Sequence, residues 1–264
     1  MRVARYCLTV VCLVGAGQIA SAQLPLTRVK SVYPPSGQVG TTFDLQLTSG
    51  DDLEEVAALH FTHPGITAAP KMQEVEGKQQ PVDNQFVVTI AGNVPPGIYE
   101  LRASGLWGVS NPQRFSVSAR PLVGEAEPNN ALEQAQAIAV NSSVFGRMDG
   151  GTDIDAFKFT AEAGQRIVFD CLSERLDSQM DADLMIRDAN GRRVTWAHNT
   201  LGDDPTLVFD VPAAGEYVIE VHDHTYRNGQ EYVYRLDIHT GPHIALVMPP
   251  AGQAATKSKF TLYG

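Results

Sequence analysis

Short runs that alternate between apolar and polar residues recur along this sequence, and they constrain its fold more than any other feature. Clear examples are Phe86–Ile90, Ile98–Ala103, Arg166–Leu172, Glu216–Asp223 and Glu231–Ile238, each bounded by Gly, Pro, Asn or Asp. Alternation gives a strand one buried face and one exposed face. Many short strands separated by regular turn signals are typical of antiparallel β-sandwiches. We therefore predict an all-β chain built of tandem antiparallel β-sandwiches.

The first 22 residues have the three parts of an export signal. Arg2 and Arg5 give a positive start, Cys7–Ala16 is apolar, and Ala20-Ser21-Ala22 is a cleavage site with small residues. The alternative is a membrane anchor, which needs a longer apolar run than this one. We predict a signal peptide over residues 1–22 and an exported protein that is periplasmic, attached to the cell surface or extracellular. We expect no membrane span in the mature chain.

The charge balance limits the kinds of partner that this chain can bind. Its formal net charge is -10, whereas binding to the phosphates of nucleic acid requires a basic surface. We therefore expect no nucleic acid partner, while divalent cations remain compatible with the charge. Once Cys7 and Cys12 leave with the signal, Cys171 is alone. We expect no internal disulfide and predict that Cys171 is a small buried apolar side chain.

A long-range repeat divides the sequence into modules. The segment 32–47 returns as 247–262, with a shared Pro-Pro-x-Gly-Gln phrase, a threonine and an alternating run. We predict one sandwich over residues 24–119, a second over 120–242, and the start of a repeat of the first over 243–264. One strand or two cannot bury an apolar face alone. We therefore expect the chain to be the front part of a longer modular protein or a truncated reading frame. The alternative is that residues 243–264 form an isolated docking tail.

The middle segment resembles a known family. The phrases that carry the resemblance follow one another in order and are Glu125–Asn130, Val144–Ile167, Asp183–Arg193, Val211–Val221 and Tyr232–Ile238. They resemble the bacterial pre-peptidase C-terminal (PPC) domain, a β-sandwich with a jelly-roll-like fold that is found as an accessory module on exported proteases. That domain is similar in fold to the collagen-binding modules of clostridial collagenases. Residues 24–119 resemble a bacterial immunoglobulin-like (Ig-like) domain.

The resemblance implies a non-catalytic module associated with secretion, attachment or spacing, and several such modules bind calcium. Carried over by motif, the implied calcium ligands are Glu125, Glu127, Asn129, Asn130, Asp153 and Asp155, with Asp149 as an alternative to Asp155. Asn130 stands where the family often has an aspartate. One negative charge fewer is expected to weaken a calcium site, because calcium affinity follows the charge of the ligands.

The residues themselves favour the same site. Glu125, Glu127 and Asn129 alternate, so in an extended segment they point the same way. The glycine-containing loop 149–155 can bring further carboxylates toward them, and carboxylates that converge without a cation repel one another. Calcium prefers several such hard oxygen ligands. The alternative is a solvated acidic linker beside a helix over residues 130–138, which is capped by Asn129 or Asn130.

Two further groups of residues have weaker patterns. His222 and His224 share one strand face at a spacing that can bind zinc, but no third ligand is indicated, so we expect a solvated surface. Asp181 and Asp183 are candidates for a second oxygen site. Protease chemistry needs a positioned serine, histidine and acid; Ser104 and His60 occur, but without a Gly-x-Ser-x-Gly motif. We expect no catalytic residues.

These observations predict a non-catalytic exported binding or spacer protein whose second module is stabilised by calcium. The alternative is that this chain is the accessory region of a larger secreted protease with its catalytic domain elsewhere. A lectin-like sandwich is a further alternative. The expected partner is an extracellular protein or a polysaccharide.

Overall fold

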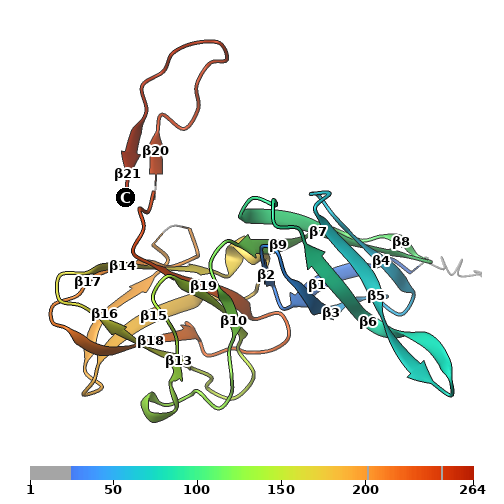
Figure 1. Cartoon of the computed structure of the whole chain (residues 1–264), viewed down its shortest axis with the longest axis horizontal. Coiled ribbons are helices and arrows are strands. Elements are labelled where there is room, and N and C mark those ends of the chain that lie inside the picture. Colours follow the sequence, from blue (N-terminus) through green and yellow to red (C-terminus); the bar gives the residue numbers. More distant parts are fainter. Residues whose placement is uncertain (1–24, 201, 245) are drawn as a thin grey trace, which may run out of the picture.

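The structure is a computed structural model that describes residues 25–200, 202–244 and 246–264, and it consists of two β-sandwiches and a projecting hairpin (Figure 1). Within these residues the only helical segments are two short 3-10 turns, so the predicted all-β fold is confirmed. None of the described helical segments has the length and apolar character needed to cross a bilayer. The predicted signal peptide, residues 1–22, lies outside the described residues.

The first sandwich packs two sheets around one apolar core. One sheet has the order β1 (Arg28–Tyr33), β3 (Thr42–Asp51), β6 (Lys78–Ile90) and β5 (Ile66–Val75). The other has the order β2 (Ser36–Gln38), β9 (Gln113–Ser118), β7 (Gly97–Gly105) and β4 (Val56–Phe61), and β8 (Gly108–Val109) pairs with β7. Alternate residues of both sheets fill the core, among them Val32, Leu45, Phe86, Leu101 and Phe115.

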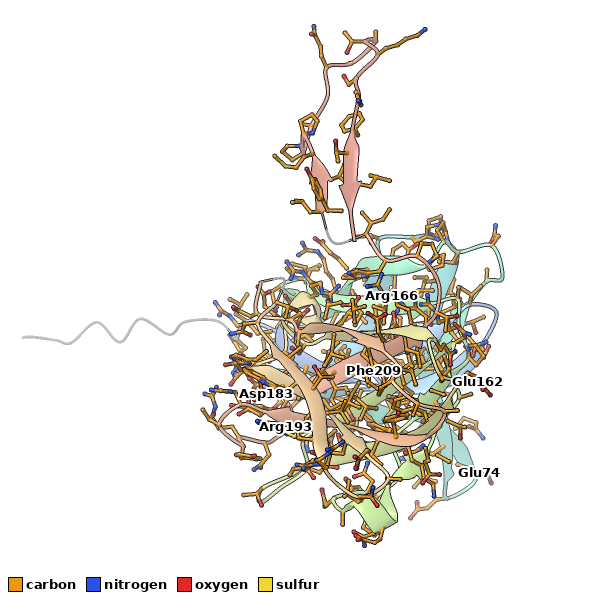
Figure 2. All side chains as sticks on the ribbon, turned by 90° about the vertical axis from the view of Figure 1, so that its left-hand side faces the viewer. Glu74, Glu162, Arg166, Asp183, Arg193 and Phe209 are labelled. Atoms are coloured by element: carbon orange, nitrogen blue, oxygen red, sulfur yellow. The ribbon has the colours of Figure 1, made fainter. Side chains whose placement is uncertain are left out.

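The second sandwich has two five-stranded sheets. One contains β10 (Leu122–Gly124), β12 (Ser142–Arg147), β19 (Val233–His239), β14 (Arg166–Leu172) and β17 (Thr206–Asp210), in that order. The other contains β11 (Gln136–Ala137), β13 (Asp155–Ala161), β18 (Gly215–Asp223), β15 (Ala182–Asp188) and β16 (Arg193–His198). The core between them holds Phe157, Phe169, Ile219, Leu236 and the buried Cys171, and Phe209 is seen inside this sandwich in Figure 2.

The helix that we considered for residues 130–138 does not form. The segment makes one 3-10 turn, η1 (Leu132–Gln134), without a side-chain cap, and then enters β11, which pairs in parallel with Phe157 and Lys158 of β13. Leu132 packs against a small apolar cluster that includes Val218. Pairing at the sheet edge and this apolar contact therefore outweigh the helix propensity of the alanines.

The repeated segments pair in the same register. In the first sandwich Val32 of β1 lies opposite Leu47 of β3. In the C-terminal hairpin, formed by β20 (Leu246–Met248) and β21 (Thr261–Tyr263), Val247 lies opposite Leu262. The hairpin projects from the second sandwich (Figure 1). Leu262 and other apolar side chains on it are exposed.

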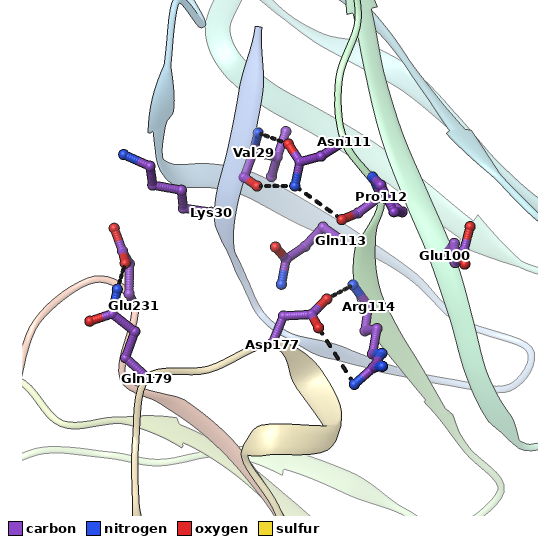
Figure 3. Close-up of a pocket in the computed structure, with 10 residues that line it drawn as sticks. All are labelled: Val29, Lys30, Glu100, Asn111, Pro112, Gln113, Arg114, Asp177, Gln179 and Glu231. Carbon is purple, nitrogen blue, oxygen red and sulfur yellow. Dashed lines mark hydrogen bonds and ion pairs between the residues drawn. The ribbon is translucent and has the colours of Figure 1, made fainter.

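Direct contacts join the two sandwiches. Tyr33 packs edge-on against Phe145, with ring centroids 5.5 Å apart. The buried side chain of Gln113 donates from Nε2 to the carbonyl of Leu176, at 2.9 Å, in the second 3-10 turn, η2 (Glu174–Leu176). The backbone amide of Arg114 donates to Asp177 Oδ2 at 2.8 Å. Beside these bonds lies an interdomain pocket (Figure 3), lined by residues of both sandwiches: Val29, Lys30, Glu100, Asn111, Pro112, Gln113, Arg114, Asp177, Gln179 and Glu231.

Candidate metal centre

Three carboxylates converge where the linker between the sandwiches meets the second sandwich. Glu125 directly follows β10, Glu127 lies two residues on, and Asp155 is the first residue of β13. One carboxylate oxygen from each lies within 4.8 Å of the other two. We call Glu125, Glu127 and Asp155 the acidic cluster. Asp155 is fully buried and Glu127 is exposed, so the cluster has one side in the protein and one side in solvent.

Neighbouring strands hold the acidic cluster in place. Arg147 of β12 donates its backbone amide to Glu125 Oε1 at 2.7 Å. The buried hydroxyl of Tyr234, on β19, donates to Asp155 Oδ2 at 2.5 Å and lies 3.3 Å from Glu125 Oε2. Gly146 permits this approach, because a Cβ atom there would be 2.2 Å from Glu125 Oε2 and 2.4 Å from the Tyr234 hydroxyl.

Asn129 adds a fourth polar group to the cluster. Its side chain is fully buried, and one of its terminal atoms lies 3.2 Å from Asp155 Oδ1 and 3.1 Å from Glu127 Oε1. If this atom is the amide nitrogen, it donates to both carboxylates. If it is the oxygen, three oxygen atoms face one another, which costs free energy unless a carboxylate is protonated or a cation lies among them. Asn129 can therefore satisfy the cluster without an ion or bind an ion with it.

The electrostatics of the cluster disfavour its fully ionised form. Burial raises the pKa of Glu125 to about 7, and burial together with the nearby Glu125 raises the pKa of Asp155 well above its usual range. Burial also raises the pKa values of Glu127 and Asp153, and neighbouring aspartates add to this effect. In the described part of the chain, no lysine, arginine or histidine forms an ion pair with any of these four residues. Their negative charge is therefore not compensated by side chains of the protein.

The other predicted ligands lie beside the acidic cluster and shape the loop next to it. Asn130 Oδ1 accepts a hydrogen bond from the backbone amide of Ile154 at 3.2 Å. Asp153, which is 4% exposed, accepts from the backbone amide of Asp149 at 2.5 Å. Asp149 itself pairs with the Arg147 guanidinium at 2.6 Å. The structure thus brings Glu125, Glu127, Asn129 and Asp155 together, and uses Asn130 and Asp153 for backbone hydrogen bonds.

Sequence reasoning missed two residues of the site. Tyr234 lies in the alternating run Glu231–Ile238, but nothing in that pattern indicated that its hydroxyl would reach a carboxylate of the opposite sheet. Tyr33 of the first sandwich has its hydroxyl 3.5 Å from Glu125 Oε1, and its ring lies under the Arg147 guanidinium, 5.0 Å from the ring centroid. The partial burial and negative surroundings of Tyr33 raise its pKa. The site therefore touches both sandwiches.

The histidine and the serine that we considered for protease chemistry lie next to each other, but their surroundings do not complete a protease site. His60 Nε2 lies 2.8 Å from Ser104 Oγ, where β4 pairs with β7. Both side chains are on the sheet surface, and His60 is exposed. Among the residues described, no carboxylate forms an ion pair with His60, so nothing orients its ring in the way that a catalytic triad requires.

Comparisons with known proteins give a family for the second sandwich. Residues 153–223 match the sequence profile of the bacterial pre-peptidase C-terminal domain. A probable subtilase-type serine protease of Deinococcus radiodurans is 31% identical over 101 residues, covering 36% of this chain. The match spans only 14% of that protease.

Solved structures are similar to parts of the chain. The pre-peptidase C-terminal domain of a Bacillus anthracis collagenase is 20% identical, with 42% of this chain and 99% of that chain covered at a TM-score of 0.34. A periplasmic inhibitor of g-type lysozyme from Aeromonas hydrophila is 16% identical, with 39% and 95% covered at a TM-score of 0.31. It is the sequence match over residues 153–223 that identifies the second sandwich of this chain as a bacterial pre-peptidase C-terminal domain.

Proposed function

We propose that this chain is a non-catalytic binding or spacer segment of an exported protein, and that calcium held by the acidic cluster stabilises its PPC domain. The observation that carries the proposal is the convergence of Glu125, Glu127 and Asp155, which form no ion pair with a cationic side chain among the described residues. Carboxylates that are brought together in this way cost free energy unless they are protonated or share a cation. At neutral pH a divalent cation removes that cost for all three.

The donor set fits calcium. Calcium takes six to eight oxygen ligands, with carboxylates binding through one or both oxygens and water completing the shell. Glu125, Glu127 and Asp155 offer carboxylate oxygens, and Asn129 offers an amide oxygen in one of its two orientations. Glu127 is exposed, so water can reach the ion from its side. The cluster contains no nitrogen or sulfur ligand of the kind that transition metals prefer.

The location of the cluster suggests what the ion does. Glu125 directly follows β10, a strand of the second sandwich, and its Oε1 lies 3.5 Å from the Tyr33 hydroxyl in the first sandwich. Asp155 opens a strand of the second sandwich. A cation shared by these two carboxylates holds Glu125 against β13 and beside Tyr33, and so restricts the angle between the modules.

Scanning calorimetry of the whole chain with calcium, with magnesium and with a chelator tests this proposal. We expect calcium to raise the melting temperature of the wild type and magnesium to do so much less, because magnesium demands a stricter octahedral geometry. Glu127→Gln should lose most of the calcium effect. Glu133→Gln, which changes an exposed glutamate in the same segment outside the cluster, should keep it. Equal melting temperatures of the wild type in calcium and in chelator would contradict the proposal that calcium stabilises this protein.

A substitution at the buried ligand Asp155 distinguishes the loss of a metal ligand from the loss of folded structure. Asp155→Asn keeps the shape of the side chain and removes one uncompensated charge. In chelator it should therefore melt at or above the wild-type temperature, while in calcium it should melt below the wild type. If Asp155→Asn melts lower than the wild type by the same amount in both conditions, the carboxylate has a structural role only.

The match to a subtilase-type serine protease supports a second candidate, in which this chain is an accessory region of an exported protease. Labelling the whole gene product with a fluorophosphonate probe tests it, since only a protein that also contains an active serine hydrolase domain should react. N-terminal sequencing of the secreted protein tests export, with Gln23 as the expected first residue. Retention on collagen or polysaccharide resins tests whether the chain binds a partner or acts as a spacer alone.

A further inference from the structure

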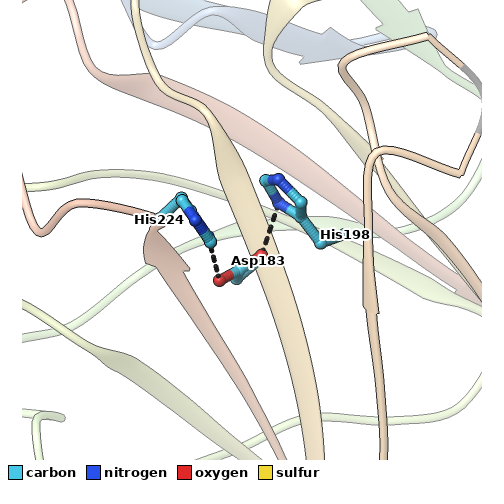
Figure 4. A group of neighbouring side chains, drawn as sticks. All are labelled: Asp183, His198 and His224. Atoms are coloured by element: carbon cyan, nitrogen blue, oxygen red, sulfur yellow. Dashed lines mark hydrogen bonds and ion pairs between the residues drawn. The ribbon is translucent and has the colours of Figure 1, made fainter.

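A second group of potential metal ligands lies on the outer face of the second sandwich. Asp183 is on β15, His198 ends β16, and His224 directly follows β18. The strand register places His198 directly opposite Asp183. The backbone amide of His224 donates to the carbonyl of Asp181 at 2.7 Å, which extends the pairing of β18 with β15 and brings His224 beside Asp183. Figure 4 shows the Asp183 carboxylate between the two imidazole rings.

The potential ligand atoms of this group face one another closely. His198 Nδ1 lies 2.6 Å from Asp183 Oδ1, and His224 Nδ1 lies 3.0 Å from Asp183 Oδ2. The two rings are stacked, with centroids 4.2 Å apart. One nitrogen from each ring and a carboxylate oxygen lie within 4.8 Å of one another. We call Asp183, His198 and His224 the histidine cluster.

Hydrogen bonding alone does not satisfy the histidine cluster. Asp183 Oδ1 and His198 Nδ1 are both buried atoms without a hydrogen bond of acceptable geometry, although they are only 2.6 Å apart. When the Asn199 amide is oriented to satisfy its neighbours, its oxygen accepts from His198 Nε2 at 3.0 Å. The proton of a neutral His198 ring is then on Nε2, which leaves a lone pair on Nδ1 directed toward a carboxylate. A metal ion bound to both atoms, or a second proton on the His198 ring, removes the repulsion.

We propose that Asp183, His198 and His224 bind a divalent transition metal of the zinc type. Two imidazole nitrogens and one carboxylate are a usual protein ligand set for zinc and a poor one for calcium. The bond from His198 Nε2 to Asn199 fixes the ring so that Nδ1 is the ligand atom, as outer partners do in known zinc sites. His224 is 50% exposed, so an ion can enter from solvent.

The geometry requires only small adjustments. Ligand atoms at about 2.0–2.1 Å from a tetrahedral zinc lie about 3.3 Å from one another, slightly farther than the 2.6 and 3.0 Å seen here. Rotation of the half-exposed His224 ring can supply part of the difference. Asp181 Oδ1 lies 3.8 Å from His198 Nδ1 and is available as a fourth ligand, and water is the alternative.

The histidine cluster is distinct from the acidic cluster because the two lie on opposite faces of one sheet. Asp155 and Leu184 are both paired with Val221 and share the inner face. Asp183 is the neighbour of Leu184 along β15, so its side chain points outward. The sequence pattern had indicated His222 together with His224, but His222 is buried and stacks on Tyr226 with centroids 4.8 Å apart. The ligand that was missing from the sequence, His198, comes from the neighbouring strand.

Calorimetric titration of zinc chloride into the whole chain at pH 7.5, with calcium present, tests the proposal. We expect one zinc per chain for the wild type, and an affinity at least tenfold lower for His224→Gln and for Asp183→Asn. His60→Gln removes an exposed imidazole from the first sandwich and should bind like the wild type. His224 is half exposed, so its variant should fold, which circular dichroism and an unchanged calcium-induced rise in melting temperature would verify.

Cobalt gives an independent readout. The visible absorption of bound Co²⁺ should appear with the wild type and His60→Gln, and should be lost with His224→Gln. A wild type that binds no zinc, or cluster variants that bind zinc as tightly as the wild type, would overturn the proposal. In those cases the histidine cluster is a hydrogen-bonded surface group only.

Discussion

Tyr234 donates a hydrogen bond to Asp155 at 2.5 Å and thereby connects the two sheets of the second sandwich at the acidic cluster. Tyr234 is on β19 and Asp155 is on β13, which belong to different sheets. Both side chains are fully buried. A hydroxyl and a carboxylate in such a place stabilise the fold only while they satisfy each other.

Tyr234→Phe should destabilise the protein by about 1–3 kcal/mol in chelator, because it leaves a buried carboxylate without its donor. The loss should be smaller in calcium if the ion satisfies the same oxygen. Urea unfolding measured in both conditions checks the prediction. Tyr232→Phe is the matched control, because Tyr232 is also buried in this core but its hydroxyl makes no hydrogen bond within the described residues. Equal effects of the two substitutions would contradict a specific role for the Tyr234 hydroxyl.

Much of the second sandwich could be predicted from the alternation in its sequence, but the contacts between strands could not. The alternating runs Glu216–Asp223 and Glu231–Ile238 do form strands with an apolar face in the core. The polar face that alternation predicts to be exposed is buried as well. The strand-spaced motif pointed to Glu127, and the family resemblance implied Asp155; the structure brings their carboxylates together. His198 was not, since its role depends on which strand pairs with β15, and alternation does not specify strand order. Local propensity also misled over residues 130–138, where a 3-10 turn and the edge strand β11 form in place of a helix.

Gly146→Ala should disrupt the acidic cluster, because its methyl group would overlap the carboxylate of Glu125 and the hydroxyl of Tyr234. Overpacking of this kind costs about 1–3 kcal/mol. We also expect weaker calcium binding, since Glu125 must move away from Asp155. Thermal unfolding with a calcium titration measures both effects. Gly215→Ala is the control, because a Cβ atom there has no neighbour within 4 Å. If Gly146→Ala behaves like that control, the close packing around Glu125 is not required.

Asp204 should make the second sandwich sensitive to acid. Burial alone would raise the pKa of Asp204, but hydrogen bonds from Arg175 and Ser173 outweigh burial and lower it. The folded protein therefore binds this proton less readily than an unfolded chain, in which an aspartate has a pKa of about 3.9. The contribution of Asp204 to stability is full above that value and is lost as the pH falls through the lower folded value.

Asp204→Asn should lower the free energy of unfolding at pH 7 by about 1.5–3 kcal/mol, the range for hydrogen bonds to charged groups. It should also flatten the decline of the melting temperature between pH 5 and pH 2. Asp210→Asn serves as the control, because the Asp210 and Arg166 side chains are 69% and 66% exposed and such a pair contributes little. An acid profile of Asp204→Asn that parallels the wild type would show that other carboxylates control the acid response.

Gln113→Ala should loosen the contact between the two sandwiches. The Gln113 side chain is 3% exposed, and its Nε2 donates to the carbonyl of Leu176 across the interface. Truncation leaves that carbonyl without a donor, while the bond from Arg114 to Asp177 remains. Small-angle X-ray scattering should then show a larger radius of gyration for Gln113→Ala than for the wild type, with Gln80→Ala, an exposed glutamine, unchanged.

Calcium should partly reverse this increase in the radius of gyration if the acidic cluster restricts the angle between the two sandwiches. Glu125 lies next to Tyr33, and Tyr33 packs on Phe145 at the same junction. The radius of gyration of Gln113→Ala should therefore decrease on addition of calcium by more than that of the wild type. An equal radius in calcium and in chelator for Gln113→Ala would mean that the acidic cluster stabilises the second sandwich without restraining the first.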